Sequence, residues 1–245
     1  MLEVRGLVKH FGALRATDAI DFDVAEGETH AVIGPNGAGK TTFISQLAGN
    51  LRPDAGSVRF GGTDITNLPA PRRARMGLAR SFQITSVYPE FSALDNVALA
   101  VQAHSGHSFR FWRTARGDRA LVEPAERVLQ EVGLLPRKNV LAANLAHGEQ
   151  RQLEVAMALA TGPRLLLLDE PMAGMGTEES QRMIALLSKL KQKKTIILVE
   201  HDMDAVFRLA DRISVLVYGR VIATDVPEKI KLNEEVRRAY LGEEA

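Results

Sequence analysis

The segment from Gly34 to Thr42 carries the residue types that a phosphate chain requires. It reads Gly-Pro-Asn-Gly-Ala-Gly-Lys-Thr-Thr and matches the pattern G-x-x-x-x-G-K-S/T. Glycines let the backbone point successive N–H groups at phosphate oxygens, and the dipole of a helix that starts here favours the same anion. We expect Lys40 to reach the β- and γ-phosphates of a nucleotide, and Thr41 to bind Mg²⁺ with Thr42 supporting the phosphates. The expected binding loop is Gly34, Pro35, Asn36, Gly37, Ala38, Gly39, Lys40, Thr41 and Thr42.

An acidic pair supplies a second part of such a site. Asp169 and Glu170 follow the run Leu165–Leu168, which predicts a buried strand. By itself an acidic pair in this position is more often a strand end that meets solvent. Ligands, however, bind at the carboxyl ends of parallel strands. Together with the phosphate loop, the acidic pair is therefore the expected second half of a nucleotide site. We expect Asp169 to hold Mg²⁺ through water and Glu170 to act as the general base, a role that contributes about 10²–10⁴-fold in rate.

Three single residues carry weaker signals. His201 follows the apolar run Thr195–Val199 and Glu200, where it could reach a γ-phosphate, although a lone histidine is more often structural. Gln83 carries almost no information by itself. Phe11 lies upstream of the phosphate loop and could stack on adenine, although an isolated aromatic is more often a core residue.

Short apolar runs predict the strands that hold these groups. They are bounded by polar or turn residues, as buried strands of an α/β sheet are. Residues 2–33 read as short strands with turns, and the phosphate loop is followed by a helix that Gly49 is placed to end. The apolar face of that helix holds Phe43, Ile44 and Leu47, and the later strand runs are Leu165–Leu168, Thr195–Val199 and Ile213–Val217.

The middle of the chain differs from both ends. Between about residues 94 and 160 the pattern is helical, most clearly over Glu123–Val132 and Glu149–Leu159. A helical block therefore interrupts an α/β core. Beyond the core strands, Tyr218–Arg220 predicts a hairpin turn into Val221–Ala223, and Asn233–Leu241 predicts a short charged helix.

Composition narrows the class of protein. The chain has 245 residues, 45% of them hydrophobic and 25% charged, which suits one large globular domain. Its formal net charge is +1, so global electrostatics give no reason to expect nucleic acid as a partner. It contains no cysteine, which excludes disulfides, thiolate metal sites and a cysteine nucleophile. We expect no signal peptide and no membrane span, so another chain would cross the membrane if this protein acts there.

Together and in this order, the motifs resemble those of the ATP-binding subunits of ABC transporters. The resemblance covers essentially the whole chain and includes a signature segment, Leu145–Glu149. It implies an α/β fold of the P-loop NTPase (RecA-like) type with an antiparallel β subdomain and an inserted α-helical subdomain. The implied division is an α/β core at about residues 1–90 and 160–245 and a helical subdomain at about 91–159. The matching positions are Phe11 (adenine), Gly34–Thr42 (Walker A), Gln83 (Q-loop), Leu165–Glu170 (Walker B), Met172–Thr177 (D-loop) and His201 (switch).

The resemblance also implies a mechanism with ATP and Mg²⁺ as cofactors. Two subunits would sandwich two ATP molecules head to tail, each between one subunit's Walker A loop and the other's signature. Closing on ATP and opening after hydrolysis would drive a permease. The implied catalytic residues are Glu170, His201, Gln83 and Lys40, the implied metal ligands are Thr41, Gln83 and Asp169, and the implied signature contacts are Ala146, His147, Gly148 and Glu149.

Four residues depart from the family pattern. Ala146 replaces the usual signature serine, His147 the first glycine and Glu149 the usual glutamine, while Gly176 falls where the D-loop has aspartate. His147 could donate to phosphate or point outward, and the sequence favours neither. We therefore hypothesise that the second ATP-binding subunit, which the resemblance allows to be identical or different, is a different chain with a more standard signature.

Within the family, the chain is most similar to the ATPases of branched-chain amino acid importers. The signature reads Leu-Ala-His-Gly-Glu-Gln-Arg-Gln-Leu-Glu, extra sequence lies around His104–Arg119, and the tail ends with Val236–Gly242. ATPases of urea and short-amide importers share much of this pattern, so the sequence leaves both as alternatives. The implied partners are transmembrane permease subunits and, indirectly, an extracytoplasmic solute-binding protein, with the chain on the cytoplasmic face of the cell membrane.

Other functions fit less well. Soluble ABC ATPases of translation or DNA repair generally carry two nucleotide domains or a long coiled coil, and neither is present in this sequence. P-loop kinases and GTPases would not explain the signature segment, and exporter ATPases are often fused to membrane spans. The basic, aromatic run His104–Arg119 could bind nucleic acid or lipid headgroups, but an amphipathic insertion is the simpler interpretation.

Overall fold

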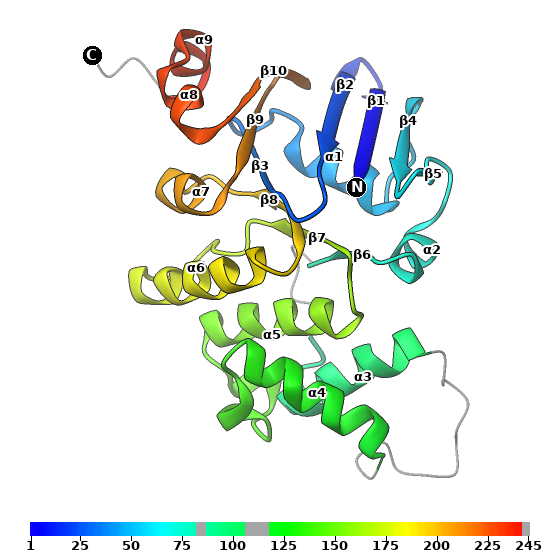
Figure 1. Cartoon of the computed structure of the whole chain (residues 1–245), viewed down its shortest axis with the longest axis vertical. Coiled ribbons are helices and arrows are strands. Elements are labelled where there is room, and N and C mark those ends of the chain that lie inside the picture. Colours follow the sequence, from blue (N-terminus) through cyan, green and yellow to red (C-terminus); the bar gives the residue numbers. More distant parts are fainter. Residues whose placement is uncertain (82–86, 106–117, 242–245) are drawn as a thin grey trace.

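The computed structural model describes residues 1–81, 87–105 and 118–241, arranged as two β-sheets with a block of helices packed below them (Figure 1). The smaller sheet has the order β2-β1-β4-β5 and is antiparallel. Its two long strands are β1 (Leu2–Phe11) and β2 (Leu14–Val24), and its two shorter ones are β4 (Ala55–Phe60) and β5 (Thr63–Asp64). Buried and exposed residues alternate at the start of β1 and in the second half of β2, which is the pattern of a sheet with one solvated face.

The larger sheet positions the predicted site. Its order is β10-β9-β3-β8-β7-β6, and every pairing is parallel except that of β9 with β10. The three central strands are buried at every residue, as expected where helices cover both faces. The strands are β3 (Thr29–Ile33), β6 (Leu78–Arg80), β7 (Leu165–Asp169), β8 (Thr195–Val199), β9 (Arg212–Val217) and β10 (Arg220–Asp225).

The predicted strand runs are confirmed within one or two residues at each end. The hairpin turn between β9 and β10 is also confirmed, with Tyr218 and Gly219 at φ 46° and 78°. Gly49 ends helix α1 (Lys40–Ala48) as predicted, in a left-handed conformation at φ 81°. The short helical ending is present too, as α9 (Glu234–Val236) followed by a π-helical turn, Arg237–Leu241.

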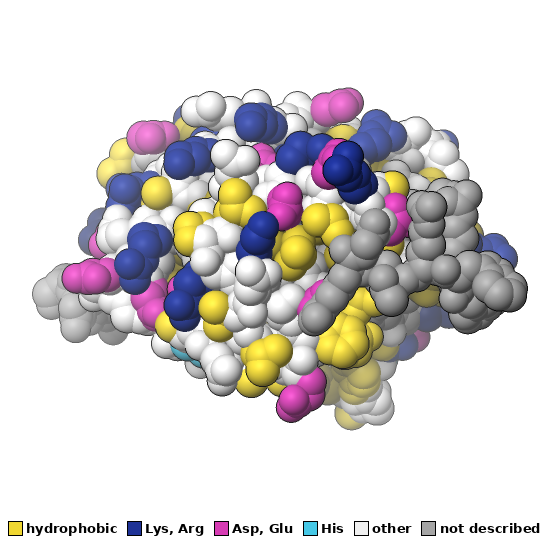
Figure 2. Space-filling model, turned by 90° about the horizontal axis from the view of Figure 1, so that it is seen from below, with side chains coloured by type: hydrophobic (Ala, Val, Ile, Leu, Met, Phe, Trp, Pro, Cys, Tyr) yellow, Lys and Arg dark blue, Asp and Glu magenta, His cyan; other side chains and the backbone are white. Residues whose placement is uncertain are grey.

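The helical block consists of α3 (Ala93–Ser105), α4 (Arg119–Glu131) and α5 (His147–Ala160). Its apolar core is continuous with the larger sheet, because Leu166 and Leu168 of β7 belong to the same cluster. Seen from this end, hydrophobic side chains lie in small groups among basic and acidic ones (Figure 2). The other helices are α2 (Ala70–Arg75), α6 (Thr177–Lys191), α7 (Met203–Leu209) and α8 (Pro227–Leu232).

Helix α4 begins earlier than the sequence pattern indicated. Asp118 caps it by accepting a hydrogen bond from the Ala120 amide at 3.0 Å, so the helix starts at Arg119 and not at Glu123. Pro124 then lies inside the helix, where it cannot donate a backbone hydrogen bond. Among the helices of the described residues, none combines the length and hydropathy that a membrane crossing requires.

Candidate functional site

The phosphate loop connects β3 to α1 and leaves no room for side chains at two glycines. A Cβ on Gly34 would lie 2.0 Å from the Leu216 carbonyl oxygen, and one on Gly39 would lie 2.1 Å from that of Ala16. Gly39 also has φ 101°, a conformation that other residues adopt only with strain. The loop therefore packs directly on neighbouring backbone, and α1 starts immediately after it with its N-terminus open to an anion.

Lys40 folds back over this loop. Its Nζ donates to the carbonyl oxygens of Gly34 and Pro35, at 2.7 and 3.0 Å, and the residue is buried. Burial lowers the pKa of Lys40, while the carboxylates of Glu170 and Asp169 act in the opposite direction. The ammonium is thus held by two neutral carbonyls next to two acidic groups, and a phosphate chain would be a stronger partner than either carbonyl.

The acidic pair lies at the carboxyl end of β7, as predicted. Asp169 accepts a hydrogen bond from Arg80 Nη2 through Oδ2 at 2.8 Å, while its Oδ1 is buried without a hydrogen-bond partner. Burial raises the pKa of Asp169, and the Arg80 guanidinium opposes that shift. Glu170 has φ 50°, a strained conformation for a glutamate, and its amide donates to the Val199 carbonyl at 2.9 Å.

The end of β8 adds a residue that the motifs do not include. Glu200 is 1% exposed and accepts hydrogen bonds from the amides of Met172, at 2.9 Å, and His201, at 3.1 Å. Its burial raises its pKa. The His201 side chain is 61% exposed. Glu200 therefore ties the loop after β7 to the start of the loop that presents His201, and a charged residue directly after a buried strand was the available sequence signal.

Phe11 ends β1 and is half exposed. The Lys9 ammonium lies 5.9 Å from its ring centroid. Phe11 pairs with Leu14, and Ala16 of the same strand contacts Gly39, so the β1–β2 hairpin borders the phosphate loop. An exposed aromatic ring in this place is available to a base. Gln83, by contrast, lies outside the described residues, as do residues 106–117 of the basic insertion.

The signature segment forms the start of α5. Ala146 is its N-cap residue, and the Glu149 carboxylate accepts a hydrogen bond from the Ala146 amide at 3.0 Å and pairs with Arg137 at 3.1 Å. The Gly148 amide donates to Glu179 Oε1 at 3.3 Å, which places the first turn of α5 against the start of α6. In the described part of the chain, no hydrogen bond or ion pair joins this segment to the phosphate loop.

His147 lies against the loop after β7. A Cβ on Gly174 would stand 3.2 Å from His147 Cε1, and one on Gly148 would stand 2.8 Å from the Glu179 carboxylate. Glu179 also accepts a hydrogen bond from the Gly176 amide at 3.3 Å. The departures at His147 and Gly176 therefore belong to one packed cluster in which Glu179 joins the helix starts of α5 and α6.

The phosphate site suits a hard divalent cation that is bound partly by protein side chains and partly by phosphate oxygens. Within residues 1–81, 87–105 and 118–241, no group of three or more His, Asp or Glu is placed to hold a metal alone. Mg²⁺ is typically bound by one or two carboxylates plus substrate phosphates, so a large cluster is not required. The unpartnered Asp169 Oδ1 is the observation that fits such a cation, because a buried carboxylate oxygen needs a partner.

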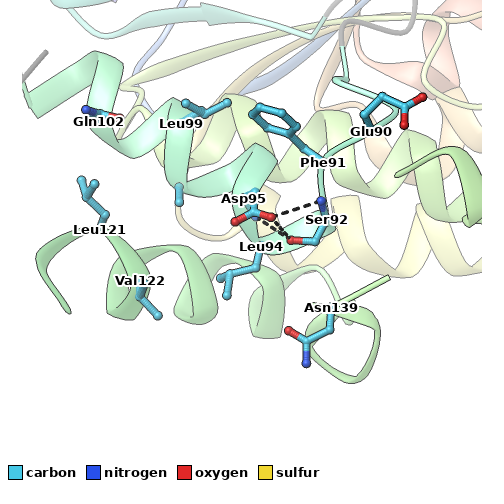
Figure 3. A pocket seen from close by; sticks show the side chains of 11 residues that line it. Glu90, Phe91, Ser92, Leu94, Asp95, Leu99, Gln102, Leu121, Val122 and Asn139 are labelled. Carbon is cyan, nitrogen blue, oxygen red and sulfur yellow. Dashed lines mark hydrogen bonds between the residues drawn. The ribbon is translucent and has the colours of Figure 1, made fainter. Parts of the chain in front are cut away.

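Several cavities in the described part of the chain lie outside the phosphate site. One, of about 710 Å³, is lined by residues of α3 and α4 (Figure 3). Two polar residues of its wall, Ser92 and Asp95, bond to each other at the start of α3. Ser92 Oγ donates to Asp95 Oδ2 at 2.6 Å and accepts from the Asp95 amide at 3.1 Å. Its wall also contains apolar side chains such as Leu94 and Leu121, so it offers few groups for catalysis.

Another of these cavities is an apolar groove of about 390 Å³. It lies where the end of α1 and helix α2 meet β6, α3 and α5, so it borders both the sheet and the helical block. Small and apolar residues such as Ala74, Leu78 and Met157 line it. Two charged residues, Arg80 and Glu154, interrupt that lining.

Two family models match this chain. The model of the ABC transporter family matches residues 17–173, which contain the phosphate loop, the signature segment and the acidic pair. The model of the branched-chain amino acid ATP-binding cassette transporter matches residues 220–245.

The chain is also similar to known proteins over almost its whole length. It is 39% identical to BraF, a high-affinity branched-chain amino acid transport ATP-binding protein of Pseudomonas aeruginosa, over 99% of this chain and 98% of that one. It is 38% identical to LivG of Escherichia coli, described in the same words, over 99% and 98% of the two chains. A solved ADP-bound ATP-binding cassette of an ABC transporter matches with a TM-score of 0.87 and 28% identity, over 99% of both chains.

Proposed function

The chain belongs to the ABC transporter family of ATP-binding subunits, and from this premise we propose that it powers the import of branched-chain amino acids or similar small polar solutes. ATP hydrolysis coupled to transport is the activity of this family. The observation that carries the solute class is the match of residues 220–245, because the general family match ends at residue 173. The relatives at 38–39% identity are named for the same solutes.

The geometry supports specific roles for the phosphate loop and the acidic pair. ATP phosphates would replace the carbonyls of Gly34 and Pro35 as partners of Lys40, and the open start of α1 would face them. Thr41 and Asp169 would hold Mg²⁺, which when bound neutralises phosphate charge. Glu170 would accept a proton from the attacking water. The exposed His201 side chain would contact the γ-phosphate, and Gln83 completes the proposed set.

A second subunit would complete the site. The signature residues Ala146, His147, Gly148 and Glu149 contact α6 and Arg137 of their own chain. An ATP molecule on another subunit would compete with the Glu149 and Glu179 carboxylates for the Ala146 and Gly148 amides. In a head-to-tail pair of subunits with ATP at the interface, the phosphate loop of one subunit would face the signature segment of the other. Since Ala146 has no hydroxyl and Gly176 no carboxylate, we retain the hypothesis that the partner ATPase is a different chain. An ATP-dependent homodimer with full, cooperative turnover would contradict it.

The apolar groove is the proposed docking surface for a permease on the cytoplasmic face of the membrane. It joins the end of α1, which begins at the phosphate loop, to α5, which begins at the signature segment. A permease segment in this groove would touch both nucleotide-contacting helices. We also propose that residues of about 91–159 form a helical subdomain and that the rest of the chain forms the core. With this division, the groove lies where the subdomain meets the core.

Solute uptake tests the proposal. A host strain that lacks this chain should lose uptake of labelled leucine, and the wild-type gene should restore it, whereas Glu170→Gln should not. Intact leucine uptake with lost urea or short-amide uptake would favour the alternative importer. Intact uptake of all these solutes, with the chain recovered only from ribosome or soluble fractions, would favour a soluble ABC ATPase.

A further inference from the structure

Arg80 joins three elements behind the phosphate loop. It begins the run Arg-Ser-Phe-Gln that resembles the Q-loop, in which only Gln83 was given a role. Its Nη2 donates to Asp169 Oδ2 at the end of β7 at 2.8 Å, and its Nη1 donates to Ser45 Oγ on α1 at 3.1 Å. The Arg80 side chain is 11% exposed and that of Asp169 is fully buried. A buried guanidinium with planar donors fixes the orientation of its carboxylate partner better than a flexible ammonium would.

The two oxygens of Asp169 are used differently. Oδ2 is held by Arg80, whereas Oδ1 is buried without a hydrogen-bond partner. Leaving a buried carboxylate oxygen unpaired is unfavourable, so this oxygen is suited to a cation. Holding one oxygen therefore decides where the other one points.

We propose that Arg80 is a positioning residue for Asp169, which holds this carboxylate in the orientation that binds Mg²⁺; the proposal rests on the nucleotide site proposed above. Two effects of the guanidinium oppose each other. Its positive charge repels a cation, and its hydrogen bonds orient the ligand. Loss of a residue that orients a metal ligand typically costs about 10–100-fold in affinity or activity, so we expect orientation to dominate.

The same residue faces the apolar groove. Arg80 and Glu154 are the charged residues that line it, and Arg80 Nε and Glu154 Oε1 are both buried without hydrogen-bond partners. A docked segment that offers an acceptor to Nε would contact the guanidinium that holds Asp169. Arg80 therefore contacts both the proposed docking surface and the proposed metal ligand.

Manganese binding tests the positioning role without turnover. Mn²⁺ replaces Mg²⁺ and is titrated by electron paramagnetic resonance into ADP-bound wild type, Arg80→Met, Arg80→Lys and the control Arg75→Met, which lies on the exposed side of α2. The affinity for ADP is measured separately in EDTA. We expect Arg80→Met to weaken Mn²⁺ binding about tenfold or more. Arg80→Lys should weaken it less, and the control should match wild type.

The specificity of the effect is tested by a second background. In Asp169→Asn, the additional change Arg80→Met should not weaken Mn²⁺ binding further, and metal-free ADP affinity should not change in any Arg80 variant. Unchanged or tighter Mn²⁺ binding in Arg80→Met would overturn the proposal, since removing a charge alone would tighten it. An equal loss of metal-free ADP affinity would also overturn it. If Arg80→Met does not fold, the proposal is overturned when Arg80→Lys binds Mn²⁺ as tightly as wild type does. Failure of the wild-type protein to bind ADP would instead refute the nucleotide site itself.

Discussion

At the residue scale, the role of Lys40 in nucleotide binding can be tested by one substitution. It is buried, held by the carbonyls of Gly34 and Pro35, and accompanied by two carboxylates. Lys40→Met keeps the apolar stem and removes the ammonium. Because hydrogen bonds to charged groups contribute about 1.5–3 kcal/mol, nucleotide affinity should fall about 10–100-fold in a fluorescence titration. The exposed Lys189→Met serves as the control and should bind as wild type does.

Gly39 makes a second residue-scale prediction. A Cβ there would lie 2.1 Å from the Ala16 carbonyl oxygen at φ 101°, whereas one on Gly133 at φ 81° meets nothing within 4 Å. Both alanine substitutions carry the conformational cost of about 1–2 kcal/mol, but only Gly39→Ala adds the steric overlap. Urea unfolding should show a larger loss of stability for Gly39→Ala than for Gly133→Ala. Equal losses would mean that the loop can move away from β2.

At the scale of elements, α1 and α2 are joined by a buried arginine. Arg73 donates hydrogen bonds to the carbonyls of Leu68, Gln46, Leu47 and Thr66 at 2.7–2.9 Å. It is 1% exposed, and burial lowers its pKa to about 10. Its donors satisfy the carbonyls at the end of α1, which a helix alone cannot pair.

Removal of this arginine should be costly. Arg73→Met leaves several buried carbonyls unpaired, and each such group costs about 1–3 kcal/mol. Chemical unfolding should therefore show a loss of about 3 kcal/mol or more, whereas the exposed Arg72→Met should stay within about 0.5 kcal/mol of wild type. Similar stabilities for the two variants would show that α1 does not depend on α2.

Helix α5 carries a pH-dependent contribution to stability. Burial raises the pKa of Glu154 above its ordinary value of 4.5, and Arg151 opposes the shift. Because the folded state holds the proton more tightly, the contribution of Glu154 is complete below 4.5 and is lost as the pH rises through the raised pKa. The free energy of unfolding of Glu154→Gln, relative to wild type, should therefore increase as the pH is raised above 4.5. No change across this range would contradict the prediction.

The elements show what a sequence can and cannot predict. The strands around Leu166 and Ile197 were predicted from apolar runs because these strands are buried on both faces. The start of α4 at Arg119 was missed because its capping residue, Asp118, falls next to the basic, aromatic run. The contact of Arg80 with Asp169 spans 89 residues and depends on β6 lying beside β7, which is a property of sheet order and not of any local pattern.

At the scale of the whole molecule, the motifs fall into two groups on one chain. The phosphate loop, the acidic pair and His201 gather at the carboxyl edge of the larger sheet, and the signature segment lies at the start of α5 (Figure 1). Glu179 joins that segment to α6. This joint and the positions of His147 and Gly176 were not predictable, because they depend on how two helix starts pack.

We propose that this chain hydrolyses ATP with Glu170 as the general base and thereby powers import. The most direct measurement is the rate of ATP hydrolysis by the detergent-solubilised transporter assembled with either wild type or Glu170→Gln, together with the nucleotide affinity of each. Loss of a general base should lower the rate by about 10²-fold or more while nucleotide affinity is retained. An unchanged rate in the Glu170→Gln transporter would contradict this account of the site.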